Sequence, residues 1–161
     1  WGVLIGLLVN LSHFLYQRLH PRIIEVGLHP DGTLRDRQLW RLPPLAGDVL
    51  ALRMDAALDF ASATALEKRV SDELASRPGV RHLCLFAQPI NRIDVTGVEA
   101  FVRLQLLMQS RGGLFHVSGL KLPVEKTLQA AQALKASGHL VVHRTDAQAI
   151  SALASAAHAV A

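Results

Sequence analysis

From residue 48 to the end of the chain, short apolar runs alternate with longer amphipathic stretches. Short runs bounded by Gly, Pro or charged residues are typical of strands. We therefore predict strands at residues 48–54, 80–87, 114–118 and 140–143. After a bulge at 55–57, a short continuation of the first strand is expected at 58–60.

The stretches between these runs have helical spacing. Between residues 62 and 76, the apolar Leu66, Val70 and Leu74 recur every fourth residue, which places them on one helix face. The same reasoning predicts helices at 62–76, 98–110, 123–137 and 145–160. Strands that alternate with helices predict an α/β domain with a central sheet, with Leu83, Leu85 and Phe101 in its core.

Three local signals mark where these helices should begin. Thr64 with Glu67, and Thr145 with Gln148, have the spacing of a capping box, in which two side chains satisfy backbone N–H groups. Pro123 suits a first helical position because its missing N–H is not needed there.

The N-terminal residues 2–15 are almost wholly apolar and are followed by Tyr16, Arg18 and Arg22. We interpret residues 1–19 as the truncated end of a transmembrane helix, with these three side chains at the membrane interface. The two arginines would then place the chain from about residue 20 onward in the cytoplasm. One alternative is a helix packed on a soluble core. The other is a signal peptide, which is disfavoured because the charges follow the apolar run and no small-residue cleavage site is present.

Between residues 20 and 47 the periodicity disappears and Pro and Gly interrupt the chain repeatedly. This composition predicts a linker or an extended arm. The sequence thus divides into a membrane-helix end at 1–19, a linker at 20–47 and a domain at 48–161.

Charge and cysteine content exclude several classes of protein. Lys and Arg outnumber Asp and Glu by 17 to 13 among 161 residues, but the chain has no block of like charge and no interleaved stacking aromatics. These features argue against nucleic acid as a partner. Cys84 is the single cysteine and lies in an apolar run, so it is expected in the core and a disulfide-built fold is excluded.

Candidate catalytic and metal-binding groups do not assemble in the sequence. The eight histidines lack the spacing of metal ligands, and we interpret them as surface or capping residues. The Gly-rich phosphate loops and the nucleophile elbow are also missing from the sequence. We therefore predict no catalytic residue, no metal, no cofactor and no enzymatic activity.

One polar segment, residues 91–99, follows a predicted strand and opens a predicted helix. At a helix N-terminus, the N–H groups and the dipole favour a phosphate on the hydroxyl of Thr96, which makes it a candidate phosphoacceptor. Thr96 and Glu99 also have capping-box spacing, which favours Thr96 as a helix cap. In that role Thr96→Val should cost about 1 kcal/mol.

Several segments together resemble a known family. They are HPRIIEVG, DGTLRD, GDVLALRMDAALDFASA and NRIDVTGVEAF, in that order after an apolar helix end. Their order and spacing are similar to the C-terminal end of a SulP-type (SLC26-like) anion transporter, which comprises the close of the last membrane helix, a linker and the STAS domain. The resemblance implies a mixed sheet of four or five strands flanked by helices.

The wider STAS family includes bacterial anti-sigma-factor antagonists, whose motif is similar to Asp-Ser-Ser-Gly with the second hydroxyl phosphorylated. By this resemblance Asp94 matches the acid, Thr96 the phosphoacceptor and Gly97 the glycine, while Val95 departs from the pattern.

The resemblance also implies a function and partners. The chain would be the cytoplasmic regulatory part of a transporter of sulfate, bicarbonate or related anions in the inner (plasma) membrane. Its partners would be the membrane part of the same transporter, a second copy in a homodimer, and a regulatory protein or a nucleotide. The alternative is a free-standing STAS switch of the antagonist type, for which the apolar N-terminal segment has no use.

Overall fold

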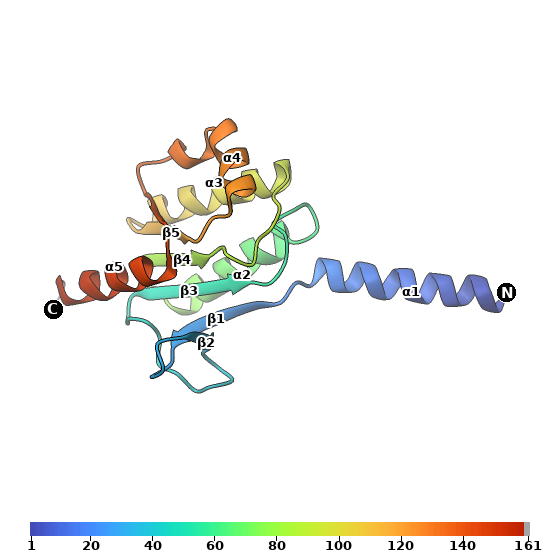
Figure 1. The fold of residues 1–161 in the computed structure, drawn as a ribbon, viewed down its shortest axis with the longest axis horizontal. Coiled ribbons are helices and arrows are strands. Elements are labelled where there is room, and N and C mark those ends of the chain that lie inside the picture. The colour runs from blue at the N-terminus through green and yellow to red at the C-terminus, as the bar shows by residue number, and fades with distance from the viewer. Residues whose placement is uncertain (160–161) are drawn as a thin grey trace.

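A single mixed sheet organises the chain in the computed structural model, which describes residues 1–159 (Figure 1). Within these residues the sheet has six strands in the order β2-β1-β3-β4-β5-β6. The strands are β1 (Ile23–Leu28), β2 (Leu34–Asp36), β3 (Val49–Met54), β4 (His82–Phe86), β5 (Leu114–Ser118) and β6 (Leu140–His143). The helices are α1 (Gly2–Leu19), α2 (Ala63–Ser76), α3 (Val95–Ser110), α4 (Leu122–Ala130) and α5 (Asp146–Ala159), with a 3₁₀ turn at Ala133–Lys135.

The sheet is parallel from β3 to β6, whereas β1 runs antiparallel to both of its neighbours. Parallel neighbours need a crossover, and α2, α3 and α4 lie on the three connections between β3 and β6. The prediction of an α/β domain with a central mixed sheet is therefore confirmed, and the four strands predicted from apolar runs are all present.

Both faces of the centre of the sheet are buried, as the alternation along β4 shows. Leu83 and Leu85 pack in a cluster with the apolar sides of α2, α3 and α4, while Cys84 and Phe86 point to the opposite face beneath α5. Phe101 of α3 joins the first cluster, so the three predicted core residues are buried. Cys84 is fully buried, and burial raises the pKa of its thiol, which leaves it a core residue without nucleophilic character.

Two strands form where the sequence predicts a linker. β1 and β2 pair as a hairpin, closed by a hydrogen bond from the amide of His29 to the carbonyl of Thr33, with Gly32 at a φ of 87°. The Pro-Asp-Gly segment that indicated a linker is therefore the turn of a hairpin. The sheet has six strands instead of the expected four or five, because β1 and β2 add to the four at 48–143.

A buried ion-pair cluster attaches this hairpin to the domain. Glu25 of β1 is 4% exposed and accepts hydrogen bonds from Arg37 at 2.9 Å and from Arg77 at 2.7 Å. Arg77, just after α2, also donates to the carbonyl of Val49 at 2.9 Å. Because a buried carboxylate needs partners, this cluster makes the antiparallel edge part of the folded domain.

Helix starts and ends differ from the sequence prediction at several points. α2 begins at Ala63 after Ser62 and has no side-chain cap, so the predicted capping box of Thr64 and Glu67 is wrong. The predicted helix at 123–137 ends at Ala130, because Gln132 adopts a left-handed backbone with φ of 57°.

Other boundaries agree, or differ by a turn. Thr145 does accept from the amide of Gln148 at 3.2 Å, as predicted, and Val160 lies outside the described residues. Pro123 is the second residue of α4, because the helix starts at Leu122. The strand expected at 58–60 is reduced to a single bridge between Leu58 and Ile93.

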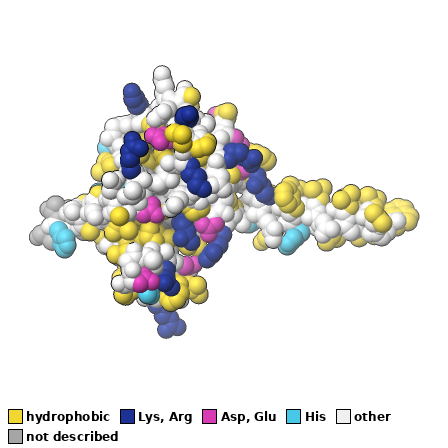
Figure 2. Space-filling view, viewed as in Figure 1, with side chains coloured by type: hydrophobic (Ala, Val, Ile, Leu, Met, Phe, Trp, Pro, Cys, Tyr) yellow, Lys and Arg dark blue, Asp and Glu magenta, His cyan; other side chains and the backbone are white. Residues whose placement is uncertain are grey.

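Helix α1 projects from the domain (Figure 1), and none of its residues from Gly2 to Leu19 is buried. Figure 2 shows apolar side chains along its whole length. A helix packed on a soluble core is therefore not what α1 forms. Within residues 1–159, no helix combines the length and the apolar character that crossing a bilayer requires.

Candidate functional site

The candidate site lies at the first turn of α3, where the β4–α3 loop ends. Asp94 is the residue before the helix, and its carboxylate accepts a hydrogen bond from the amide of Gly97 at 2.8 Å. The second carboxylate oxygen accepts from the amide of Phe60, in the β3–α2 loop, at 3.0 Å. Asp94 therefore caps α3 and fastens a neighbouring loop to it.

This geometry corrects the predicted role of Thr96. Thr96 is the second residue of α3, is half-buried, and its side chain makes no hydrogen bond to any residue in the described chain. Glu99 is exposed and forms an ion pair with Arg103 at 3.6 Å. The capping box of Thr96 with Glu99 is thus wrong, since an aspartate two residues earlier already occupies the capping position. Phosphorylation of Thr96 stays a prediction.

Gly97 allows α3 to begin this close to the β3–α2 loop. A Cβ atom at this position would lie 2.1 Å from the carbonyl oxygen of Leu58 and 2.8 Å from the side chain of Ile93. Leu58 in turn accepts from the amide of Asp94 at 3.3 Å and donates to the carbonyl of Arg92 at 3.0 Å. The glycine is required by close backbone packing, and its φ is not positive.

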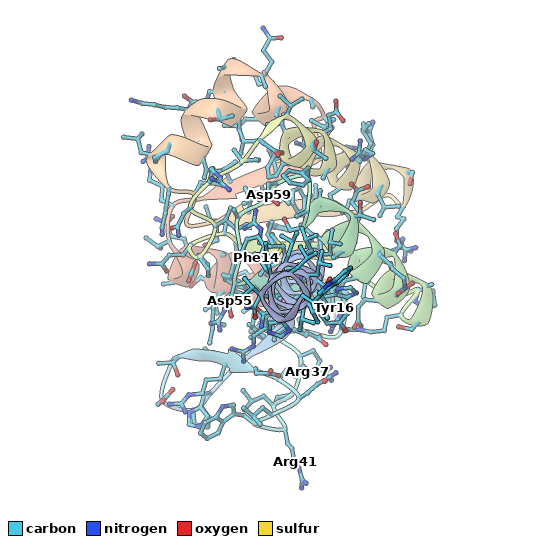
Figure 3. The ribbon with its side chains drawn as sticks, turned by 90° about the vertical axis from the view of Figure 1, so that its right-hand side faces the viewer. Phe14, Tyr16, Arg37, Arg41, Asp55 and Asp59 are labelled. Carbon is cyan, nitrogen blue, oxygen red and sulfur yellow. The ribbon has the colours of Figure 1, made fainter. Side chains whose placement is uncertain are left out.

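The same loop contacts the end of α1. Arg18, in the last turn of α1, donates to the carboxylate of Asp59 at 2.7 Å, and the side chain of Asp59 is only 4% exposed. Arg92, from the loop before α3, lies 3.5 Å from the same carboxylate. Figure 3 looks along α1 toward the domain, with Asp59 labelled above the helix. Asp59 therefore joins α1 to the loop that Asp94 holds.

Asp59 is held in its ionised form. Burial alone would raise the pKa of its carboxyl group, but hydrogen bonds from the backbone amides of Ala61 and Ser62, together with the charge of Arg18, lower the pKa below its usual range. A charged Asp59 keeps its attraction for Arg18 at neutral pH.

The other predicted interface residues lie around this junction. Arg22 is near Asp55 at 3.7 Å and Asp36 at 4.0 Å, and Tyr16 stacks on His20 with ring centroids 4.2 Å apart. Contact of Tyr16, Arg18 and Arg22 with a membrane stays a prediction.

Three histidines do assemble, against the prediction that they would be separate surface or capping residues. His82 Nδ1 lies 3.0 Å from His116 Nε2, and His116 Nδ1 lies 3.0 Å from His143 Nε2. They form a hydrogen-bonded row across β4, β5 and β6, with Asp48 3.7 Å from the outer nitrogen of His82. Burial, followed by the charges of His82 and His143, lowers the pKa of His116 to about 4.

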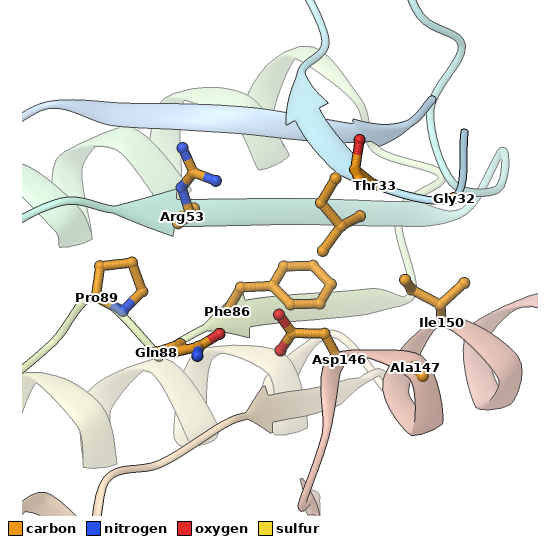
Figure 4. Close-up of a pocket in the computed structure, with 10 residues that line it drawn as sticks. Gly32, Thr33, Arg53, Phe86, Gln88, Pro89, Asp146, Ala147 and Ile150 are labelled. Atoms are coloured by element: carbon orange, nitrogen blue, oxygen red, sulfur yellow. The ribbon is translucent and has the colours of Figure 1, made fainter. Parts of the chain in front are cut away.

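A separate cavity of about 470 Å³ lies between the β1–β2 hairpin and the start of α5 (Figure 4). Its basic lining residue is Arg53, which is paired with Asp55 at 3.2 Å, and its acidic one is Asp146, which accepts from Ser118 at 2.6 Å. Arg53 is thus paired within the chain, while the Asp146 carboxylate is hydrogen-bonded to a neutral hydroxyl. A nucleotide partner stays a prediction.

Comparison with known proteins identifies the family. The STAS domain family matches residues 44–149. The chain belongs to the STAS family. The High affinity sulfate transporter 1 of Stylosanthes hamata is 30% identical to this STAS domain over an alignment of 121 residues, which covers 68% of this chain and 18% of the transporter. The chain thus spans about a fifth of the length of that relative.

Two solved structures show the same fold. The murine Solute Carrier 26 family member A9 anion transporter superposes with a TM-score of 0.76 at 14% identity, over 96% of this chain and 25% of that one. An anti-sigma factor antagonist of Thermotoga maritima superposes with a TM-score of 0.58 at 21% identity, over 65% of this chain and 86% of that one. At these low identities, the two superpositions show only that this STAS domain has the same fold as both proteins.

The sequence identifies the motif of this STAS domain but not its surroundings. Asp94, Thr96 and Gly97 lie together at the start of α3 because they are neighbours in the sequence, whereas the sequence does not indicate Asp59, Phe60 or the histidine row. Asp59 follows a strand and precedes Ser62, a pattern that suggests a turn around an aspartate side chain. Its partner Arg18 lies 41 residues earlier and has no local signal.

The first prediction concerns Gly97. Gly97→Ala should lower the free energy of unfolding by about 3 kcal/mol or more, because the new methyl group must displace the backbone of Leu58. Urea denaturation measures the change. Gly79→Ala is the matched control, because a Cβ there meets nothing within 4 Å. Equal stability of the two variants would contradict the packing role of Gly97.

The second prediction separates the cap from the candidate phosphoacceptor. Asp94→Ala should cost about 1 kcal/mol or more, since the amides of Gly97 and Phe60 both lose an acceptor. Thr96→Val should stay within about 0.5 kcal/mol of the original protein, because its hydroxyl is not bonded. Chemical unfolding of both variants checks this, and a Thr96→Val loss as large as that of Asp94→Ala would restore the capping role to Thr96.

The third prediction is a pH dependence from His116. Its pKa is about 4 in the folded protein and ordinarily 6.5, so the unfolded chain takes up the proton first. The contribution of neutral His116 to the free energy of unfolding is therefore fully present above about pH 6.5. It is lost as the pH falls toward 4, by up to about 3 kcal/mol. Unfolding midpoints across this range should fall less steeply in His116→Gln, while His13→Gln, on exposed α1, keeps the original slope. Identical slopes in all three proteins would rule out His116 as the source.

Proposed function

We propose that this chain is the C-terminal STAS region of a SulP-type anion transporter, with α1 as the cytoplasmic end of its last membrane helix. The observation that carries the proposal is the exposure of α1. Large contiguous apolar surfaces are rare on soluble proteins and mark contact with a membrane or another protein. Leu8 and Leu15 are each about half exposed, and the first arginine of the chain follows near the end of the helix.

The comparisons support this proposal from two sides. The chain is similar to a plant protein named as a sulfate transporter, and the match to the murine anion transporter covers 96% of the chain, which must include part of α1. The match to the anti-sigma factor antagonist covers 65%. A free-standing switch of that type would leave α1 without a partner, so the transporter reading is the better one.

In this proposal the STAS region regulates transport by binding and carries out no catalysis. The membrane part of the same protein moves the anion, sulfate or bicarbonate being the candidates, and the STAS domain lies on the cytoplasmic side of the inner membrane. The Arg18–Asp59 ion pair couples movements of the membrane part to the STAS domain, because it hydrogen-bonds the last turn of α1 to the β3–α2 loop. A homodimer and a regulatory partner at Thr96 are the further interactions we propose.

The fourth prediction tests this assignment in source cells. An antibody against residues 48–161 should detect a band several times larger than 17.5 kDa in the membrane fraction. Protease added to inverted membrane vesicles should remove the epitope, whereas protease added to right-side-out vesicles should leave it intact. An antibody against a known cytosolic protein serves as the fractionation control.

A band near 17.5 kDa in the cytosol would overturn the transporter assignment. The antagonist-type switch would then be the function to test, with α1 covered by another protein. Protection in inverted vesicles would overturn the cytoplasmic placement while leaving membrane attachment in place.

A further inference from the structure

A groove lies where α1 meets the domain, beside the Arg18–Asp59 pair. It has a volume of about 280 Å³. The residues that line it come from α1, from the β3–α2 loop and from the loop before α3. They are Phe14, Leu15, Arg18, Leu19, Phe60, Ala61 and Arg92. At this size it accommodates a small polar group and not an extended chain.

The accessible charge of the groove is positive. Arg18 and Arg92 share one carboxylate, that of Asp59, which leaves one positive charge in excess. The side chain of Asp59 is 4% exposed, while those of Arg18 and Arg92 are 37% and 68% exposed. A molecule that approaches from outside therefore meets two guanidinium groups and almost none of the carboxylate. Guanidinium groups bind phosphate oxygens through paired hydrogen bonds.

The rest of the groove is apolar and open. Phe60 is 70% exposed, and Phe14, Leu15 and Leu19 on α1 are each about half exposed. An inorganic anion would satisfy the arginines and leave these side chains in water. A phospholipid satisfies both, since its phosphate meets the guanidinium groups and its acyl chains lie along the apolar surface of α1.

We propose that this groove binds the headgroup of an anionic phospholipid. The inference rests on the proposed function, in which α1 is the end of a membrane helix and Arg18 lies at headgroup level. The lipid phosphate lies between Arg18 and Arg92, and Phe60 contacts the glycerol and the first acyl carbons. The lipid would thereby bridge α1 and the loop that Asp94 fastens to α3.

The fifth prediction tests this with the 161-residue chain and vesicles separated by flotation. We expect tighter association with vesicles of three parts phosphatidylcholine to one part phosphatidylglycerol than with phosphatidylcholine alone. Arg92→Gln should reduce that preference about fivefold. Arg103, on α3, is paired with Glu67 away from the groove. Arg103→Gln removes the same charge as Arg92→Gln and should keep the preference of the original chain.

Each other outcome overturns the proposal in a distinguishable way. Equal association with neutral and anionic vesicles would reject the headgroup site while leaving membrane attachment through α1 in place. Equal losses in Arg92→Gln and Arg103→Gln would assign the preference to diffuse charge. Release of the anionic vesicles by millimolar inorganic phosphate would assign the arginines to a free anion. Association with neither kind of vesicle would overturn the proposed function as well.

Discussion

The close approach of the first turn of α3 to the backbone of Leu58 is the constraint on which the candidate site depends. It exists because residue 97 has no side chain. Once the two backbones touch, Asp94 reaches the amide of Phe60, and the β3–α2 loop is fixed with Asp59 facing the end of α1. The motif that suggests phosphorylation is thus also a packing motif. Asp94 caps α3 and Gly97 allows the close approach to Leu58, and both contacts have to persist if Thr96 is phosphorylated.

Much of this fold follows from the sequence because its signals are local. Leu83 and Leu85 lie in an apolar run of strand length, and the spacing of Leu66, Val70 and Leu74 gives the buried side of α2. These patterns depend on neighbours within one element, and they were predicted correctly. Fold class and core follow from them because the central parallel strands β3, β4 and β5 are almost wholly buried, whereas β6 at the edge of the sheet is only partly covered.

What the sequence did not reveal depends on distant partners. Glu25 is an acid inside an apolar hexapeptide, and only Arg37 and Arg77 explain why it can be buried there. The histidine row needs the register of three strands, since His82, His116 and His143 are far apart in the chain. The spacing of Thr96 and Glu99 allows a capping box, so the sequence leaves Thr96 as a cap or a phosphoacceptor. In the structure Asp94 is the cap, because it precedes the helix and its two carboxylate oxygens accept from Gly97 and Phe60.

The order of α1 and β1 has a mechanical consequence. Three residues separate Leu19 from Ile23, and Figure 1 shows α1 and β1 following one another along nearly the same line. The hydrogen bonds between β1 and β3 are perpendicular to that line. A pull or push along α1 therefore loads those bonds together in shear, instead of opening them one at a time, and the antiparallel edge acts as a stiff coupling into the centre of the sheet.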